Sequence, residues 1–559
     1  MSNSNPNLPK SILALRDYSL QFFLRDLLAG ITVGLVALPL AMAFGIASGV
    51  TPQAGIYTAV VAGFIISALG GSRTQIGGPT GAFVVIVAGI VAHFGMSGLA
   101  MVTLMAGVLL VIMGLTGLGA AVRFIPRMVV IGFTNGIAVL IASTQIKDFF
   151  GLKTGPVPSE FLPRIKLLIA NGGSFTPAAL ALGAGTLVIL LILPRFTKRV
   201  PPSIVALLVC TGVCVVFHLP VETIGSKFGG IPRGLPPFSW PDFHAEHFIP
   251  LIPSAFTVAI LAALESMLSA VVADGMTGDR HNSNVELVAQ GVANMVSPLF
   301  GGIPATGAIA RTATNIRAGA RSPISGIIHA LTLLMILLVA APLASYIPLS
   351  TLAAVLFVVA YNMGEWREIG GIFRLDLTAI SVWIVTFGLT VFADLTVAVG
   401  VGITLAALLY IHRVADTTTV SAVTEEYIRD GLPHSLQGRI IPPYVSLLRI
   451  HGPFLWGTTE KLVEETVNLD AFESVVILRL RNMTAIDATG VHAIESFAKR
   501  LSESGRTLLL CGAMQQPSKL LDGSRFQERI GRENIMPNIQ AALNRAKAIH
   551  EAQGGDAIG

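Results

Sequence analysis

The sequence GGPTGAF at residues 77–83 is echoed by GGIPATGAI at residues 301–309. Both stretches lie between apolar segments, and both carry Gly-Gly, then Pro, then Thr-Gly-Ala and an apolar residue. A Gly-Pro break that opens a short apolar run is typical of a half-helix that begins inside a membrane. Two such breaks, in corresponding halves of a hydrophobic chain, indicate the binding site of a transporter. The alternative is a pair of glycine-rich kinks that let membrane helices pack closely.

The composition is that of a membrane protein. Of the 559 residues, 53% are hydrophobic and 12% are charged, whereas soluble domains average about 45–50% apolar and about 25% charged residues. Apolar segments of about 20 residues, the length that crosses a bilayer, recur from Asp26 to Ile411. We expect fourteen α-helical membrane segments, of which the third and the tenth are short: 27–47, 52–70, 79–95, 97–117, 128–145, 178–194, 201–218, 249–273, 285–300, 304–318, 324–341, 347–362, 377–393 and 394–412.

The positive charges indicate how these segments are oriented. Lys10, Arg16 and Arg25 place the N-terminus in the cytoplasm. Every second connection after it carries Lys or Arg, whereas the short connections between them carry none. An even number of segments then places the C-terminus in the cytoplasm as well. No secretory signal precedes the first segment, so we expect a multi-pass protein of the inner (plasma) membrane.

Several other classes of protein are disfavoured. The net charge of +5 is explained by the basic connections and does not indicate nucleic-acid binding. The three cysteines, Cys210, Cys214 and Cys511, are expected to be buried thiols rather than ligands of a metal ion. The sequence contains no P-loop that would indicate a pump driven by ATP. It also contains no grouping of nucleophile and base that would indicate an enzyme. We therefore expect no cofactor and no metal.

The character of the sequence changes after about residue 412. Residues 413–440 are polar and mixed, and we expect a linker between a transporter domain at 27–412 and a soluble domain at 441–552, with residues 1–26 as a cytoplasmic tail. Alternation and buried apolar runs predict strands in the soluble domain, and helices are expected between them. The expected strands are 444–450, 474–480 and 506–511, and the expected helices are 459–469, 488–504 and 535–552. Strands alternating with helices predict a small α/β layer fold.

The order of these features resembles the sulfate permease (SulP) family of anion transporters over nearly the whole chain. The most telling stretches are ALPLAMAFG at 37–45, AGIY at 54–57, LES at 264–266, DGMTG at 274–278, the run at 301–315 and, in the soluble tail, IDATG at 486–490. The tail resembles a STAS domain, a module shared with bacterial anti-sigma-factor antagonists. The resemblance implies fourteen segments in two inverted seven-segment repeats, as in the uracil permease fold. It further implies a core of segments 1–4 and 8–11, a gate of segments 5–7 and 12–14, and a homodimer.

The half-helix starts are the expected anion site. The first N–H groups of a helix lack intrahelical acceptors, and its start carries about half a positive charge, so two facing starts suit a small anion. Gly81 and Gly307 lack a Cβ and let a ligand approach the backbone. The neighbouring Ala82 and Ala308 belong to the same starts. The hydroxyls of Thr80 and Thr306 either cap the helices or contact the anion.

The resemblance adds further residues to this site. It implies that Phe44, Phe83 and Ile309 form apolar walls of the anion pocket, although each residue type is also common in ordinary packing. It implies that Arg311 contributes positive charge to the site. The alternatives for Arg311 are a salt bridge with Glu265 and a side chain that snorkels to the inner surface. Many relatives carry Gln where this chain has Leu40, so their sulfate or chloride selectivity does not transfer directly.

Glu265 is the one acidic residue of the apolar run 250–272. An ionisable group at this depth is costly, by roughly 2.5–3.5 kcal/mol for the charged residues measured at helix centres, so its default interpretation is functional. A low dielectric favours the neutral carboxyl and makes Glu265 a candidate proton carrier. Ser269 lies one turn away on the same helix face and joins it as a candidate ion-coupling residue. The alternative is that Glu265 is a buried structural residue. The resemblance associates Glu at this position with proton coupling and Asp with sodium coupling.

Asp487 and Thr489 identify the STAS loop. In the soluble antagonists that the tail resembles, the second residue after the Asp is phosphorylated, and Thr489 occupies that place. Helix capping explains both residues without regulation. A cytoplasmic protein bound by the STAS domain is a further expected partner.

The sequence therefore favours a secondary active anion transporter, expected to couple protons to the symport of an oxyanion or a dicarboxylate by an elevator-like motion. Its expected partners are a small inorganic or organic anion, a proton or sodium ion, membrane lipid and a second copy of the chain. Sodium-coupled bicarbonate transport is the first alternative. A membrane sensor and an anion channel, each regulated through the STAS domain, are the others.

Overall fold

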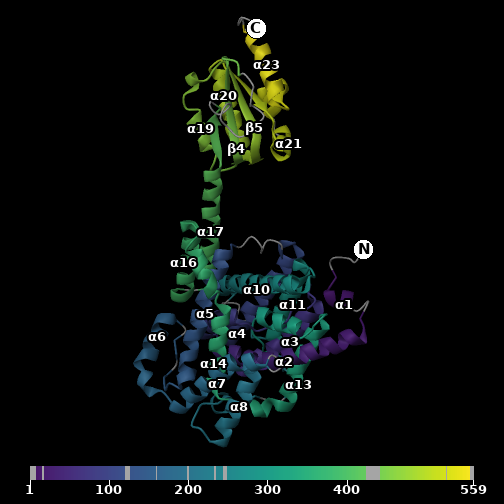
Figure 1. Ribbon diagram of the computed structural model, residues 1–559, viewed down its shortest axis with the longest axis vertical. Coiled ribbons are helices and arrows are strands. Elements are labelled where there is room, and N and C mark those ends of the chain that lie inside the picture. The colour runs from purple at the N-terminus through teal and green to yellow at the C-terminus, as the bar shows by residue number, and fades with distance from the viewer. Residues whose placement is uncertain are drawn as a thin grey trace. The chain divides into compact units, whose positions relative to one another are not determined.

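Figure 1 shows the computed structural model, which describes residues 8–14, 18–119, 126–155, 157–158, 160–197, 201–231, 234–242, 248–393, 395–423, 441–523 and 526–553. The chain forms two compact units, Met1–Thr404 and Leu405–Gly559. The first unit is helical, and α17 runs across the boundary into the second. Each unit is described by itself.

The first unit is built from apolar helices, of which eight within the described residues are long and apolar enough to cross a membrane. In chain order the helices that correspond to the expected segments are α2 (Leu20–Ala47), α3 (Pro52–Leu69), α4 (Gly81–Leu115), α5 (Arg127–Phe150), α7 (Pro177–Phe196), α8 (Pro202–Val216), α10 (Phe248–Thr277), α11 (Ser283–Val296), α12 (Ile309–Arg317), α13 (Ile324–Ala344), α14 (Leu349–Met363), α16 (Leu377–Phe392) and α17 (Leu395–Thr417). Shorter helices join them: α1 (Lys10–Ala14), α6 (Phe161–Ala170), α9 (Ile224–Phe228) and α15 (Trp366–Ile372).

These helices match the expected segments in order, with informative differences at their ends. Gly95 has a φ of 67° and divides α4, so α4 contains both the third and the fourth expected segments. With this division, the described residues hold fourteen helical segments in the expected order. Residues 20–26, expected to belong to the cytoplasmic tail, are already part of α2. The tenth segment, expected at 304–318, becomes helical only at Ile309.

The two halves of the first unit interleave. Helix α4 packs on α10 and α11, α2 packs on α13, and α5 packs on α14 and α16. Figure 1 shows α2, α3, α4, α10, α11 and α13 side by side. Small residues allow this close approach. A Cβ added to Gly291 of α11 would lie 2.6 Å from the carbonyl oxygen of Gly107, and one added to Gly30 of α2 would lie 2.5 Å from that of Ser325.

Two buried carboxylates hold the connections on either side of the helix breaks. Asp26 of α2 accepts hydrogen bonds from the backbone N–H of Arg321 (2.7 Å), from the backbone N–H and hydroxyl of Ser322, and from the hydroxyl of Tyr18 (2.8 Å). Glu286 of α11 accepts the N–H groups of residues 71 and 72 at 2.8 and 3.1 Å. Charge-assisted bonds of this kind are the strong ones in proteins. They position the chain just before the first break and just after α12.

The second unit contains a five-stranded sheet of order β3-β4-β5-β6-β7, in which only β3 is antiparallel to its neighbour. The strands are β3 (Thr419–Ala422), β4 (Val445–Phe454), β5 (Val475–Ile486), β6 (Thr507–Cys511) and β7 (Ile535–Met536), and the helices are α19 (Glu460–Glu465), α20 (Ala488–Glu503), α21 (Gln515–Gly523), α22 (Phe526–Ile530) and α23 (Ile539–Ala552). Helix α20 covers one face of the sheet and α23 covers the other. The three expected strands are present. The expected helix at 535–552 begins only at Ile539, because residues 535 and 536 pair with β6.

The expected linker at 413–440 is only partly irregular. Helix α17 continues to Thr417, and residues 419–422 form the edge strand β3 against β4. The soluble unit therefore includes residues that were assigned to the linker from their polar composition. The rest of the expected linker, 424–440, lies outside the described residues, as do residues 1–7 and 15–17 of the expected N-terminal tail.

Candidate functional site

The two echoing stretches meet in space. Gly77 and Gly78 form β1, which pairs antiparallel with β2, formed by Thr306 and Gly307. The pairing is extended by a hydrogen bond from the N–H of Ala308 to the carbonyl oxygen of residue 76, at 2.8 Å. The sequence predicted two neighbouring helix starts. The pair of extended segments that joins them was not predicted.

The start of α4 faces both Glu265 and the helices beyond it. The hydroxyl of Thr80 caps no N–H group of α4. It donates instead to the carboxylate of Glu265, with 2.8 Å between Oγ1 and Oε2. A Cβ added to Gly81 would lie 2.5 Å from Met363 Cε of α14 and 3.1 Å from Ile141 Cδ1 of α5. The first turn of α4 is therefore placed where α10, α5 and α14 converge.

The second break is built differently from the expectation. The hydroxyl of Thr306 donates to the carbonyl oxygen of Ala262 at 3.0 Å and lies 2.7 Å from Ser266 Oγ, which in turn accepts the N–H of Gly307 at 3.1 Å. A Cβ added to Gly307 would lie 1.7 Å from Gln75 Nε2. In this structure Gly307 allows the Gln75 amide to pack closely against the backbone, because the chain runs extended through residues 306 and 307 before α12 begins.

Helix α12 nevertheless presents a free start. Its first helical hydrogen bond runs from the N–H of Thr312 to the carbonyl oxygen of Ala308, at 2.8 Å. The N–H groups of residues 309–311 therefore have no acceptor inside the helix. Ile309 is 40% exposed at this start, whereas Ala308 and Ala82, its counterpart in α4, are buried. The start of α12 therefore offers N–H donors to an anion.

Arg311 is buried behind β1. Its side chain is 3% exposed, and its Nη2 donates to the carbonyl oxygen of Pro79. Its Nη1 has no hydrogen-bond partner among the described residues, and it would lie 2.6 Å from a Cβ added to Gly78. The hydrogen bond of Arg311 is thus to the turn before α4, no salt bridge joins its side chain to Glu265 among the described residues, and its burial excludes snorkelling to the surface. The cation contributes positive potential from behind the two helix starts.

Ser269 shares with Ser266 the side of α10 that faces the second break. Ser269 Oγ lies 3.0 Å from Thr312 Oγ1, and Thr312 Oγ1 accepts the N–H of Ile76 at 3.0 Å. Neighbouring residues of one helix therefore contact both breaks: Glu265 contacts the start of α4, while the serines contact β2 and α12. A shift of α10 would be felt at both breaks.

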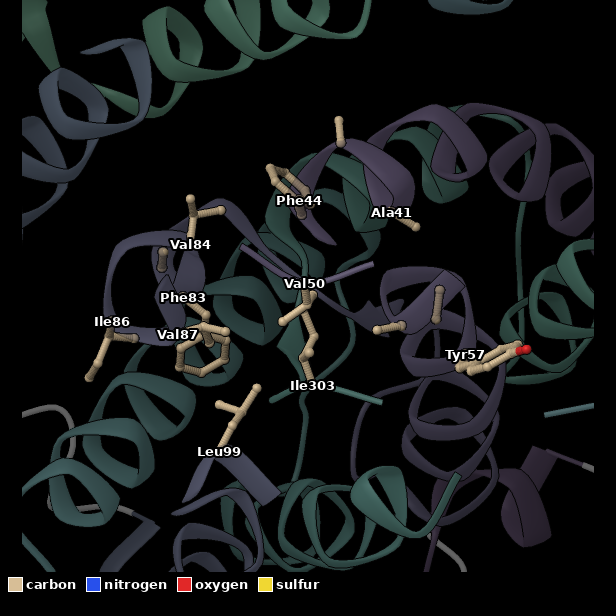
Figure 2. Close-up of a cluster of buried hydrophobic side chains, with 14 of the residues drawn as sticks. Ala41, Phe44, Val50, Tyr57, Phe83, Val84, Ile86, Val87, Leu99 and Ile303 are labelled. Carbon is tan, nitrogen blue, oxygen red and sulfur yellow. The ribbon is translucent and has the colours of Figure 1, made fainter. Parts of the chain in front are cut away.

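The three expected apolar walls differ in their surroundings. Phe44 is buried, and its Cε1 lies 3.4 Å from the position of a Cβ on Gly81, which places it at the start of α4. Phe83 is 1% exposed and belongs to the same large apolar cluster as Val87 and Leu99 (Figure 2). Phe44 and Phe83 are therefore both buried in one apolar cluster at the start of α4, whereas Ile309 is exposed at the start of α12.

Sequence reasoning missed the amides that hold the broken backbone. Asn294 of α11 pairs with both backbone groups of Ala305, accepting its N–H and donating to its carbonyl oxygen, each at 2.8 Å. Asn315 donates to the carbonyl oxygen of Thr74 at 2.9 Å. Non-helical backbone at membrane depth must be satisfied by protein groups. Polar amides inside otherwise apolar segments were the signal that could have identified these residues.

The STAS loop is a helix cap. Asp487 precedes α20, and its two carboxylate oxygens accept the N–H of Gly490 at 2.8 Å and the N–H of Trp456 at 2.9 Å. Capping thus accounts for the Asp. Thr489 lies in the first turn of α20 with an exposed side chain.

Comparison with known proteins finds similarity over nearly the whole chain. The chain matches the sulfate permease family over residues 23–386 and the STAS domain over residues 439–542. It is 42% identical over 522 residues to the putative sulfate transporter YvdB of Bacillus subtilis, covering 93% of this chain and 97% of that one. It is 31% identical over 541 residues to the bicarbonate transporter BicA of Picosynechococcus, covering 93% and 94%.

Two solved structures are similar in fold. The murine anion transporter Slc26a9 in its inward-facing state superposes with a TM-score of 0.87 at 18% identity, covering 97% of this chain and 94% of that chain. The transmembrane domain of a cyanobacterial BicA superposes with a TM-score of 0.61 at 32% identity, covering 70% and 98%. The first likeness concerns the fold alone.

Proposed function

Because the chain belongs to the sulfate permease family of anion transporters and carries a C-terminal STAS domain, we propose that it is a secondary active transporter that couples an oxyanion or a dicarboxylate to protons. The observation that carries this proposal is the hydrogen bond from Thr80 at the start of α4 to Glu265 of α10. It links the residue proposed to carry the proton to the helix start proposed to hold the anion. The family comprises transporters, not enzymes.

The proposed anion site lies between the starts of α4 and α12. The unpaired N–H groups of both starts and the guanidinium of Arg311 supply positive potential. The hydroxyl of Thr80 and the apolar side chains of Phe44 and Ile309 complete the site. Gly81 and Ala82 supply the backbone at the start of α4. Thr306, Gly307 and Phe83 support the site through their packing.

The proposed coupling of proton and anion depends on the hydroxyl of Thr80, which Glu265 and the anion would share. When Glu265 is ionised, its carboxylate accepts the hydrogen bond of the Thr80 hydroxyl, and its negative charge repels an arriving anion. Protonation removes that charge and releases the hydroxyl to donate to the anion. Proton and anion therefore favour each other's binding, and by linkage the effect is reciprocal. Ser269, beside Thr312, is proposed to keep α10 in register with α12 during this change.

We assign the motion to an elevator-like movement of a core against a gate. The contacts of Gly81 with Met363 and Ile141 support this assignment, because they join the first turn of α4 to α14 and α5. In the proposed arrangement the chain is a homodimer in the inner membrane, and both termini are cytoplasmic. Regulation is assigned to the STAS domain through a cytoplasmic partner and through phosphorylation of Thr489, whose Ala variant is expected to change regulation without changing anion affinity.

Counterflow in proteoliposomes tests the proposed function. Vesicles loaded with unlabelled sulfate, bicarbonate, fumarate or succinate are assayed for uptake of the same labelled anion. Uptake of the accepted anion is then driven by an imposed pH gradient or by an imposed sodium gradient. Accumulation with the pH gradient alone is the expected result, and accumulation that requires sodium contradicts proton coupling. Flux per protein far above a carrier's turnover indicates a channel.

Sodium-coupled bicarbonate transport is the second candidate. The 31% identity to BicA, over nearly the whole of both chains, favours it. For this candidate, counterflow is expected to show selective exchange of bicarbonate. Accumulation is then expected to require the imposed sodium gradient. The carboxyl of Glu265 is then a ligand of the coupling ion instead of a proton carrier.

A further inference from the structure

A polar cavity lies apart from the proposed transport site. Its volume is about 620 Å³, and its walls come from the end of α5, the start of α7, the connection before α9 and the start of α14. None of the residues assigned above to the anion or to the proton lines it. Its charged lining residues are Lys147, Asp148, Lys153 and Glu222.

The charges around this cavity sum to +1, because Lys147, Lys153 and Lys227 face the two carboxylates Asp148 and Glu222. Lys227 of α9 lies 3.3 Å from Asp148 and 4.0 Å from Glu222, so both wall carboxylates share a cation. Lys147 makes its hydrogen bond to the carbonyl oxygen of Thr154, at 3.3 Å. Within the described residues, the ion pairs of the cavity thus involve Lys227, whereas Lys147 and Lys153 remain as positive charges on its wall. Such a wall suits an anion better than a cation.

The start of α14 adds donors to the same cavity. Helix α14 has fifteen residues, and Pro348 before it offers no capping side chain. Ser350 lines the cavity from the second position of the helix. It is 2% exposed, and its hydroxyl has no hydrogen-bond partner among the described residues. A buried hydroxyl without a partner is costly. At this helix start the N–H of Leu349 donates to the carbonyl oxygen of Glu222 at 2.9 Å and that of Thr351 to the carbonyl oxygen of Pro348 at 3.2 Å. The N–H of Ser350 has no such acceptor among the described residues, and an oxyanion is the ligand that would satisfy both its N–H and its hydroxyl.

We propose that this cavity binds a small oxyanion, a sulfate or a carboxylate, at a second site separate from the transport site. Ser350 and the start of α14 donate hydrogen bonds to it, and Lys147 and Lys153 neutralise its charge. The site goes beyond the proposed function, because transport requires no second anion. Helix α14 runs from Ser350 to Met363, about 20 Å away at 1.5 Å per residue, and Met363 contacts the start of α4. An anion held at one end of α14 therefore acts on the helix that faces the transport site at its other end.

A cysteine reporter in the cavity tests the proposal. The three native cysteines are buried, and Thr154→Cys keeps the carbonyl oxygen that Lys147 contacts. The full-length variant in phosphatidylcholine nanodiscs is treated with methanethiosulfonate reagents that carry either a sulfonate or a trimethylammonium group. We expect the anionic reagent to react faster, and saturating sodium sulfate to slow it at constant ionic strength. Equal rates, or a faster cationic reagent, would overturn the proposal.

Matched variants separate this site from its rivals. Lys147→Met is expected to lower the preference for the anionic reagent about threefold, the scale of one partly screened charge, whereas Lys166→Met, on α6 and outside the cavity, leaves it unchanged. Protection by sulfate must persist in a Thr80→Val background. Loss of protection there means that it is transmitted from the transport site and overturns a separate site. The last measurement uses nanodiscs that contain phosphatidylglycerol and no sulfate. If the cysteine is protected there as strongly as it is by sulfate, the cavity binds a lipid headgroup, and the proposal of a free oxyanion is contradicted.

Discussion

Gly307→Ala is the sharpest test of how the second break is built. The new methyl group would lie 1.7 Å from Gln75 Nε2, 2.8 Å from Gln75 Cδ and 3.2 Å from Ser266 Cα. Gln75 is buried, so its amide can withdraw only by entering packed space and by giving up its 3.3 Å hydrogen bond to the carbonyl oxygen of Ser266. Overpacking costs about 1–3 kcal/mol, and a lost hydrogen bond costs about 1 kcal/mol. We expect a destabilisation of about 2–4 kcal/mol in total.

The assay is the midpoint temperature at which purified protein loses its monodisperse peak, with equilibrium anion binding measured alongside. Gly89→Ala is the matched control, because a Cβ on Gly89 meets nothing within 4 Å. Gln75→Ala is expected to remove the clash, so that the double variant is no less stable than Gln75→Ala alone. A wild-type midpoint for Gly307→Ala would refute this reasoning. If anion affinity were lost at the same time, Gly307 would be leaving room for a ligand after all.

Three further predictions address the two units separately. Thr80→Val removes the hydrogen bond to Glu265 with little change in shape. Equilibrium binding is expected to show an anion affinity that is about 10- to 150-fold weaker, since bonds to charged groups contribute about 1.5–3 kcal/mol. Asp487→Ala removes the cap of α20 and is expected to destabilise the STAS unit by about 1–2 kcal/mol in thermal unfolding, with transport retained and Asp487→Asn milder. Burial raises the pKa of the Cys511 thiol to about 11. The stability that this thiol contributes is therefore complete below the unfolded pKa of about 8.5. As the pH rises toward 11, the free energy of unfolding falls by about 3 kcal/mol. Unfolding of Cys511→Ala between pH 8 and 11 is expected to show a smaller loss than that of the parent.

The sequence predicted those features that depend on local chemistry. Apolar runs and the Gly-Pro breaks located the helical segments, because only residues of these types can cross a bilayer or interrupt a helix there. Asp487 was recognisable as a cap because a carboxylate directly before a helical pattern binds its first N–H groups. Glu265 was recognisable because it is the one acidic residue of its segment.

Features that depend on distant partners were not predictable from the sequence. The extended residues 306 and 307 are held by β1 and by Ser266 and Gln75 from other parts of the chain, so no local pattern distinguishes them from a first helical turn. Strand β3 is similar: Thr419–Ala422 is short and polar, and it becomes a strand only because β4 offers it an edge. Arg311 was expected near the anion, but its burial behind β1 depends on the turn at Pro79.

The central claim is that Glu265 carries the coupled proton. Its most direct test is uptake of the anion selected by counterflow into proteoliposomes that contain Glu265→Gln, driven by an imposed pH gradient. Gln keeps the size of the side chain and can still accept the hydrogen bond of Thr80, but it cannot bind a proton. Glu368→Gln is the control. Glu368 is far from Glu265 in the sequence, pairs with Arg127 and is about half exposed to solvent. We predict that Glu265→Gln abolishes accumulation driven by the pH gradient while exchange and binding persist. Accumulation with the wild-type dependence on that gradient would contradict the account.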